Sequence, residues 1–180
     1  MNTRNTATLH GNFMVVDQLG VAITGAPGSG KSELALALLE RGHRFVSDDA
    51  VDLYCDGNKV MGRCPNVSAK FMLIAGIGVI NIAKLFGNTA FVPEYELQLI
   101  IQLVNPEEMP THADPLHPLL KSIKIRDVTI PKIVFPASTA RRLPLLIETL
   151  IRNYRLKLDG YDAGVEFTKR QRFASGTAYD

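Results

Sequence analysis

The stretch that decides the fold is Gly25-Ala26-Pro27-Gly28-Ser29-Gly30-Lys31-Ser32, which matches G-x-x-x-x-G-K-[ST] at every fixed position. An apolar run at 21–24 precedes it, and a leucine-rich helical pattern over 33–41 follows it. This order of strand, loop and helix is the context that a phosphate-binding loop requires. The alternative, a glycine-rich turn that only caps a helix, is disfavoured because both flanking elements are well formed.

The residue types of this loop point to a phosphorylated ligand. Glycine at 25, 28 and 30 lets the backbone turn tightly and bring its N–H groups close to an anion. The helix that follows adds unpaired N–H groups and the positive end of its dipole. Lys31 can reach the terminal phosphates, and the Ser32 hydroxyl can join the ligands of a bridging Mg²⁺. The expected ligands are therefore a nucleoside triphosphate, taken as ATP, and Mg²⁺, with residues 25–32 forming the binding site.

Length and composition predict one ordinary domain. The chain has 180 residues, of which 46% are hydrophobic and 21% charged. A net charge of +2 gives no reason to expect binding to nucleic acid or to an anionic membrane. There is no apolar signal region after the N-terminus and no run as long as a membrane span, so we expect a cytoplasmic protein. Cys55 and Cys64 have no metal or disulfide signature and are interpreted as reduced residues.

A second group of polar residues follows a predicted strand at 43–47. This strand delivers Asp48 and Asp49 at its C-terminal end, where ligand sites in open α/β sheets collect. One carboxylate there can hold Mg²⁺, and its neighbour can accept the proton of an attacking hydroxyl. A simple turn would be the interpretation of an isolated Asp-Asp pair, but the neighbouring phosphate loop favours a function.

The other patterns describe a mixed sheet with helices. Short β patterns at 7–10 and 13–16 precede the loop strand, and a turn at 18–20 joins 13–16 to the loop strand as an antiparallel hairpin, which is unusual for parallel nucleotide-binding folds. Pro131 favours an edge strand, because proline cannot donate to a sheet. The remaining expected elements are a hairpin at 51–61, a short helix at 79–86, a buried strand at 95–104, an irregular surface segment at 105–127 with solvated His112 and His117, an edge strand at 128–135, a helix at 144–158, and a short helix and frayed tail at 161–180. The helix at 144–158 is expected to bury one apolar face, with Ile147, Leu150, Ile151, Tyr154 and Leu158, and to present Glu148, Arg152 and Arg155 on the opposite, solvated face.

Several motifs in register resemble one family, the catalytic domain of HPr kinase/phosphorylase. They are Leu9-His10-Gly11, GAPGSGKSELAL, ERGHRFVSDDAVDLY, AGIGVINIAKLFG, IPKIVFPA with Arg141 shortly after, and KLDGYDA at 157–163. The resemblance covers about residues 7–165, leaving 166–180 as a C-terminal tail of a single domain. The family's separate N-terminal domain is not matched, so the resemblance implies a short form with the catalytic domain only.

The resemblance implies an ATP-dependent protein serine kinase that acts on the phosphocarrier HPr in the control of carbohydrate metabolism. Dephosphorylation by phosphate would be its reverse activity. The implied fold is an α/β phosphate-loop domain with a mixed sheet, similar to the nucleotide-binding domain of phosphoenolpyruvate carboxykinase, and the implied assembly is a homohexamer. The implied catalytic residues are His10, Lys31, Asp48 as the base, and Arg141; the implied metal ligands are Ser32 and Asp49.

One segment departs from the family pattern. The family phrase Glu-x-Arg-Gly-x-Gly corresponds here to Leu73-Ile74-Ala75-Gly76-Ile77-Gly78. Apolar residues thus replace a carboxylate and an arginine. Loss of the arginine cation can raise the free-energy barrier to phosphoryl transfer by several kcal/mol. Two alternatives therefore stay open: a nucleotide-binding regulatory module with weakened catalysis, and a related kinase with a different substrate.

Overall fold

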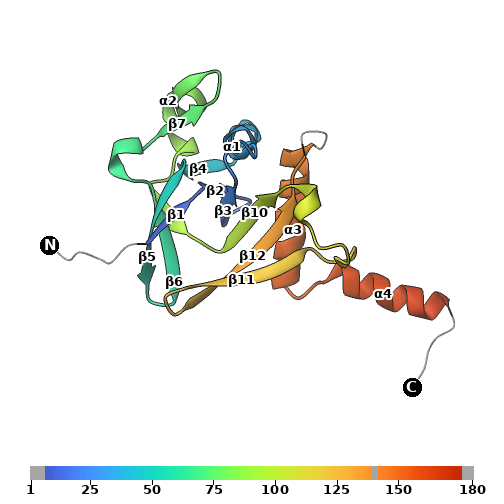
Figure 1. The fold of residues 1–180 in the computed structure, drawn as a ribbon. Helices are drawn as coiled ribbons and strands as arrows, with labels where there is room; N and C mark the ends of the chain where they lie inside the picture. The colour runs from blue at the N-terminus through green and yellow to red at the C-terminus, as the bar shows by residue number, and fades with distance from the viewer. Residues whose placement is uncertain (1–6, 139–141, 176–180) are drawn as a thin grey trace.

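The computed structural model describes residues 7–138 and 142–175. Arg141, one of the predicted catalytic residues, lies outside these ranges. The described part of the chain contains three β-sheets, four α-helices and three short 3₁₀ helices (Figure 1). Within it, no helix is both long enough and apolar enough to span a bilayer.

A six-stranded sheet forms the centre of the fold. Its strands lie in the order β11 (Leu119–Ile125), β12 (Val128–Pro136), β10 (Leu99–Val104), β3 (Leu19–Gly25), β2 (Asn12–Val16) and β4 (Arg44–Ser47). β10 runs parallel to both β3 and β12, whereas the other neighbours are antiparallel. The predicted mixed sheet is confirmed.

Both faces of this sheet are covered, which explains why every residue of β2 is buried. Met14 and Val16 point into a core shared with α1 (Lys31–Glu40) and α3 (Leu143–Leu158). Phe13 and Val15 point to the opposite side, into a second core. That second core lies against a four-stranded antiparallel sheet of β1 (Ala7–His10), β5 (Ala50–Asp56), β6 (Lys59–Arg63) and β9 (Glu94–Glu96).

A small hairpin and a short helix project from one end of the molecule. The hairpin consists of β7 (Phe71–Ile74) and β8 (Gly78–Asn81), and it leads into α2 (Ile82–Phe86). Figure 1 shows β7 and α2 together at the same end as α1, whereas α4 (Ala163–Ala174) extends from the opposite end. The 3₁₀ helices are η1 (Asn66–Ser68), η2 (Asn88–Ala90) and η3 (Pro106–Glu108).

Four sequence expectations about these elements were wrong. The run at 95–104 is two strands in different sheets, because the chain crosses between layers at Leu97 and Gln98. The segment at 105–127 contains β11, and the predicted helix at 79–86 starts only at residue 82 because β8 precedes it. β12 is not an edge strand: Pro131 lies just before Lys132, where pairing with β10 begins, so its missing N–H interrupts no bond there.

The helix predicted at 144–158 is confirmed as α3, but the side chains that it buries differ from those expected. Ile147 and Ile151 are buried as expected, but Leu158 is exposed. Glu148, expected on the solvated side, is only 2% exposed and contacts Arg41 and His43 at the end of α1. Arg41 Nη2 donates to its Oε2, and His43 Nε2 lies 2.7 Å from its Oε1. These contacts fasten the helix that carries the glycine loop to α3.

Candidate active site

The glycine-rich loop joins the C-terminal end of β3 to the first turn of α1. α1 begins at Lys31, and Gly30 precedes it with φ of 85°, a conformation that disfavours any residue with a Cβ. Gly25 is required for a second reason, since a Cβ there would meet the Leu103 carbonyl oxygen and Ser29 Oγ at 2.8 Å each. The loop is thus pressed against the end of β10, and its expected strand, loop and helix context is confirmed.

The Lys31 ammonium lies over the loop itself. Its Nζ donates to the carbonyl oxygens of Gly25 and Ala26, both at 3.0 Å. Lys31 and Ser32 are half-buried at the start of α1. An anion in this loop would meet the ammonium group together with the N-terminal N–H groups of a ten-residue helix.

Asp48 and Asp49 occupy a tight turn between β4 and β5. The Ser47 hydroxyl donates to the Ala50 carbonyl at 2.5 Å, and the Ala50 N–H donates to the Asp48 carbonyl at 2.7 Å. Asp49 has φ of 63°, a left-handed conformation that aspartate tolerates better than most residues. Backbone strain of this kind is concentrated at functional sites.

The Asp48 carboxylate is positioned by the β7–β8 hairpin. The Leu73 backbone N–H donates to Asp48 Oδ2 at 2.9 Å. Burial raises the pKa of Asp48 above its usual range, and the Asp49 charge adds to that rise. The Leu73 N–H and the Ser32 hydroxyl oppose it, because both hydrogen-bond to the charged form. Sequence reasoning did not predict that the Leu73 backbone N–H contributes to the site, because a pattern of side chains does not indicate which backbone groups donate.

His10 reaches the same end of the molecule through strand pairing. It is the last residue of β1 and lies opposite Ala50, the residue after Asp49. The Gly11 N–H then donates to the Asp49 carbonyl at 3.0 Å, which joins the backbone directly after His10 to Asp49. The structure therefore brings five of the expected site residues near one another: Lys31 and Ser32 from the loop, Asp48 and Asp49 from the turn, and His10 beside them.

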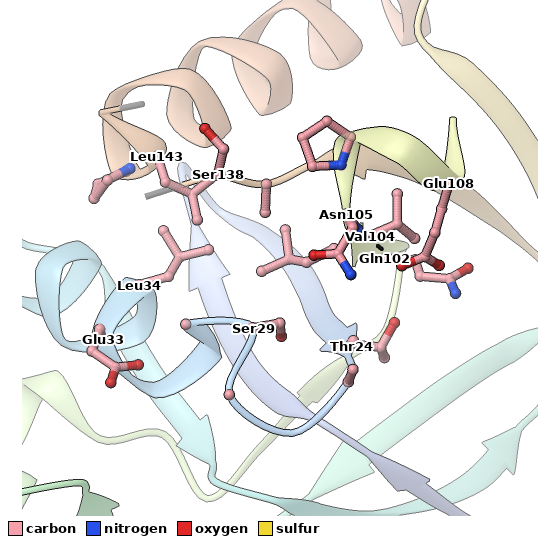
Figure 2. Close-up of a pocket in the computed structure, with 18 residues that line it drawn as sticks. Thr24, Ser29, Glu33, Leu34, Gln102, Val104, Asn105, Glu108, Ser138 and Leu143 are labelled. Carbon is pink, nitrogen blue, oxygen red and sulfur yellow. Dashed lines mark hydrogen bonds between the residues drawn. The ribbon is translucent and has the colours of Figure 1, made fainter. Parts of the chain in front are cut away.

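Two cavities flank the glycine loop. The larger, about 920 Å³, opens toward the ends of β10 and β12 and is lined by the loop, Gln102, Asn105, Glu108 and Leu143 (Figure 2). The smaller, about 560 Å³, lies on the side of Lys31 and Ser32 and is bordered by residues 73–78 of the hairpin. Gly28, Gly30 and Glu33 line both cavities, so the loop forms the partition between them.

The family model described as HPr Serine kinase C-terminal domain matches residues 2–171. The chain belongs to this family. A solved structure of the HPr(Ser) kinase/phosphatase from Coxiella burnetii is similar, with 50% identity and a TM-score of 0.80 over 85% of this chain and 99% of that one. The mixed α/β fold predicted from the sequence agrees with that match.

Curated relatives of this chain carry the name HPr kinase/phosphorylase. The protein from Chromobacterium violaceum is 42% identical over 167 residues, and that from Lactobacillus acidophilus is 40% identical over 157. These matches cover 92% and 87% of this chain but 52% and 48% of the relatives. The chain thus spans about half the length of the curated relatives it matches.

The donor set of the site fits Mg²⁺ bound together with a phosphate ligand. Three or more clustered histidine, cysteine or carboxylate ligands are not found among the described residues. Mg²⁺ at nucleotide sites usually takes only one or two protein oxygens, and phosphate and water supply the rest. The Ser32 hydroxyl is close enough to Asp48 to lower the pKa of that carboxyl, and Asp49 follows directly, so hard oxygen donors are available beside the loop.

Proposed function

We propose that this chain is an ATP-dependent serine kinase for the phosphocarrier HPr and catalyses the reverse phosphorolysis of phosphoserine. The observation that carries the proposal is the placement of Asp48 beside the phosphate loop, in a chain of the HPr kinase family. The names of the relatives supply the substrate, HPr, and the second activity. Cytoplasmic location and assembly into a homohexamer, which the resemblance implies, are part of the same proposal.

The loop and Lys31 would hold the phosphates of ATP. The ammonium group would exchange its two carbonyl partners, Gly25 and Ala26, for phosphate oxygens. Such an exchange brings a cation to the charge that develops on the transferred group. Ser32 and Asp49 would hold Mg²⁺, which supplies charge neutralisation between the phosphates when it is bound.

The orientation of the nucleotide follows from the two cavities. Lys31, Ser32 and the hairpin that holds Asp48 all border the smaller one. The terminal phosphate and the acceptor serine would therefore lie there, leaving the larger cavity for ribose and base. Its lining of amide, carboxylate and apolar side chains suits a nucleoside, and its position at the ends of parallel strands agrees with the usual location of ligands in α/β sheets.

Asp48 would act as the base. As the serine oxygen forms its bond to the γ-phosphorus, the bond from that phosphorus to the β,γ-bridging oxygen breaks and ADP leaves. The serine proton passes to Asp48, whose raised pKa makes the carboxylate a better proton acceptor than an ordinary aspartate. In phosphorolysis Asp48 would take a proton from inorganic phosphate as a phosphate oxygen bonds to the phosphorus of phosphoserine. The bond from that phosphorus to the serine oxygen breaks, the serine oxygen takes the proton from Asp48, and pyrophosphate leaves. His10 and Arg141 would support the transferring group, as the resemblance implies.

The test is transfer from γ-labelled ATP and Mg²⁺ to purified HPr, run beside Lys31→Ala and Asp48→Asn. Lys31→Ala should weaken ATP binding, whereas Asp48→Asn should retain ATP binding and lose transfer by about 10²-fold or more. A wild-type protein that binds ATP but transfers nothing to HPr would contradict the proposal. In that case the regulatory module, which the apolar residues Leu73 and Ala75 favour, becomes the better interpretation.

A further inference from the structure

The β7–β8 hairpin is apolar on both of its faces. Met72 and Ile74 point inward and are buried in the core beside α1. Leu73 and Val79 lie directly opposite each other on the outward face and are 62% and 68% exposed. Phe71 shares that face by the two-residue period of a strand, and Ile77 in the connecting turn is also exposed. We call these four residues, Phe71, Leu73, Ile77 and Val79, the hairpin face.

An outward apolar face is unusual for a small exposed hairpin, whose solvent side is normally polar. No charged residue occurs anywhere between positions 71 and 81. The hairpin projects at the end of the molecule beside α1, so the main sheet does not cover its outward side (Figure 1). The exposure of such a face to water is unfavourable, and this cost is removed only when another apolar surface covers the face.

The hairpin face is continuous with the site of phosphoryl transfer. Leu73 belongs to both: its side chain points outward, and its backbone N–H donates to the Asp48 carboxylate. Leu73 and Ile77 also line the smaller cavity together with Lys31 and Ser32. A macromolecule that brings a hydroxyl to Asp48 must therefore lie against these side chains.

We infer that the hairpin face is the docking surface for the protein acceptor and that the acceptor serine is flanked by apolar side chains, which contact Leu73 and Val79. This inference rests on the proposed kinase function and adds the chemistry by which the acceptor is recognised. Because residues 71–81 contain no ionisable side chain, recognition at this face depends on apolar contact and not on charge complementarity.

Val79 provides the sharpest test, because it is outward, exposed and not part of the lining of either cavity. Val79→Lys and Val79→Glu introduce opposite charges at one point. Both should raise KM for HPr about tenfold, since each places a charge in an apolar contact. Val79→Thr, which keeps the branched Cβ, should raise it less. The affinity for ATP, measured by titration in the absence of HPr, should stay within about twofold of wild type for all three.

The matched control is Leu120→Lys, at a half-exposed leucine on β11, the strand at the far edge of the main sheet. It should leave KM for HPr unchanged. Opposite effects of lysine and glutamate at position 79 would show recognition by charge and overturn the inference, as would unchanged KM in both.

Sedimentation and wild-type transfer complete the test. Unchanged KM for HPr together with altered sedimentation of the Val79 variants would make the face a contact between copies of this chain, and the inference would be wrong. Absence of transfer to HPr by the wild-type protein would refute the proposed function, and the inference with it. Normal wild-type transfer with unaffected variants would refute the inference alone.

Discussion

Replacement of Glu148 by glutamine tests how α1 is fastened to α3. The carboxylate is 2% exposed and is hydrogen-bonded by Arg41 and His43, and the Arg41 contact is the main cause that lowers the pKa of Glu148 to about 2. Relative to the ordinary value of 4.5, this pKa corresponds to about 3 kcal/mol of preference for the charged form. Because the Arg41 side chain is 43% exposed and its attraction is screened, we expect a loss of about 2 kcal/mol in Glu148→Gln.

The pH dependence of that loss has a definite sign. A carboxyl group with a lowered pKa stabilises the folded protein above its unfolded-state value, and this stability disappears as the pH falls through the folded-state value. Urea unfolding at pH 7 should therefore show the full difference between wild type and Glu148→Gln. At pH 3 the difference should be clearly smaller, because the wild-type contribution is partly lost between about pH 4.5 and 2.

Glu40→Gln is the matched control, because Glu40 is an exposed carboxylate in the last turn of α1, next to Arg41. It should change the free energy of unfolding by less than about 0.5 kcal/mol. A wild-type free energy of unfolding in Glu148→Gln at pH 7, or an equal loss at both pH values, would refute the assignment of the lowered pKa to this ion cluster.

Three further outcomes are expected. The acid limb of the pH profile of kcat/KM should lie above the usual range of an aspartate, because Asp48 must be ionised to accept a proton and burial raises its pKa; stopped assays between pH 4 and 8 measure it. Gly25→Ala should weaken ATP binding at least tenfold in a titration, since its Cβ would meet the Leu103 carbonyl at 2.8 Å. His117→Ala should lower the melting temperature most at low pH, because Asp114 and then Asp162 raise the pKa of His117 and the charged form is lost as pH rises through that value.

The elements that the sequence predicted well are those with local signals. The phosphate loop has fixed residue types at fixed spacing, and the helix at 143–158 has a proline in its first turn and a clear apolar face. The hairpin of β5 and β6 has a glycine turn between two β patterns. In each case the interactions that decide the structure lie within a few residues of one another.

The features that sequence reasoning missed depend on contacts between distant segments. The apolar run at 95–104 gives no sign that the chain leaves one sheet for another at Leu97. His117, expected to be solvated, is flanked by two carboxylates, and one of them, Asp162, belongs to the start of α4. Glu148 was assigned to the solvated side because helical periodicity cannot show that Arg41 and His43 lie above it. Arg141 lies outside the described residues, and its catalytic role stays a prediction.

The parallel pairing of β3 with β10 has a consequence for synthesis of the protein. Leu99 pairs with Val21, so β3, the strand that leads into the glycine loop, cannot pair with β10 until the ribosome has added 78 more residues. Until that neighbour leaves the ribosome, β3 can pair only with β2 and presents an apolar open edge. The loop also lacks the β10 carbonyl against which Gly25 packs. Nascent chains shorter than about a hundred residues should therefore be vulnerable to aggregation and unable to retain nucleotide.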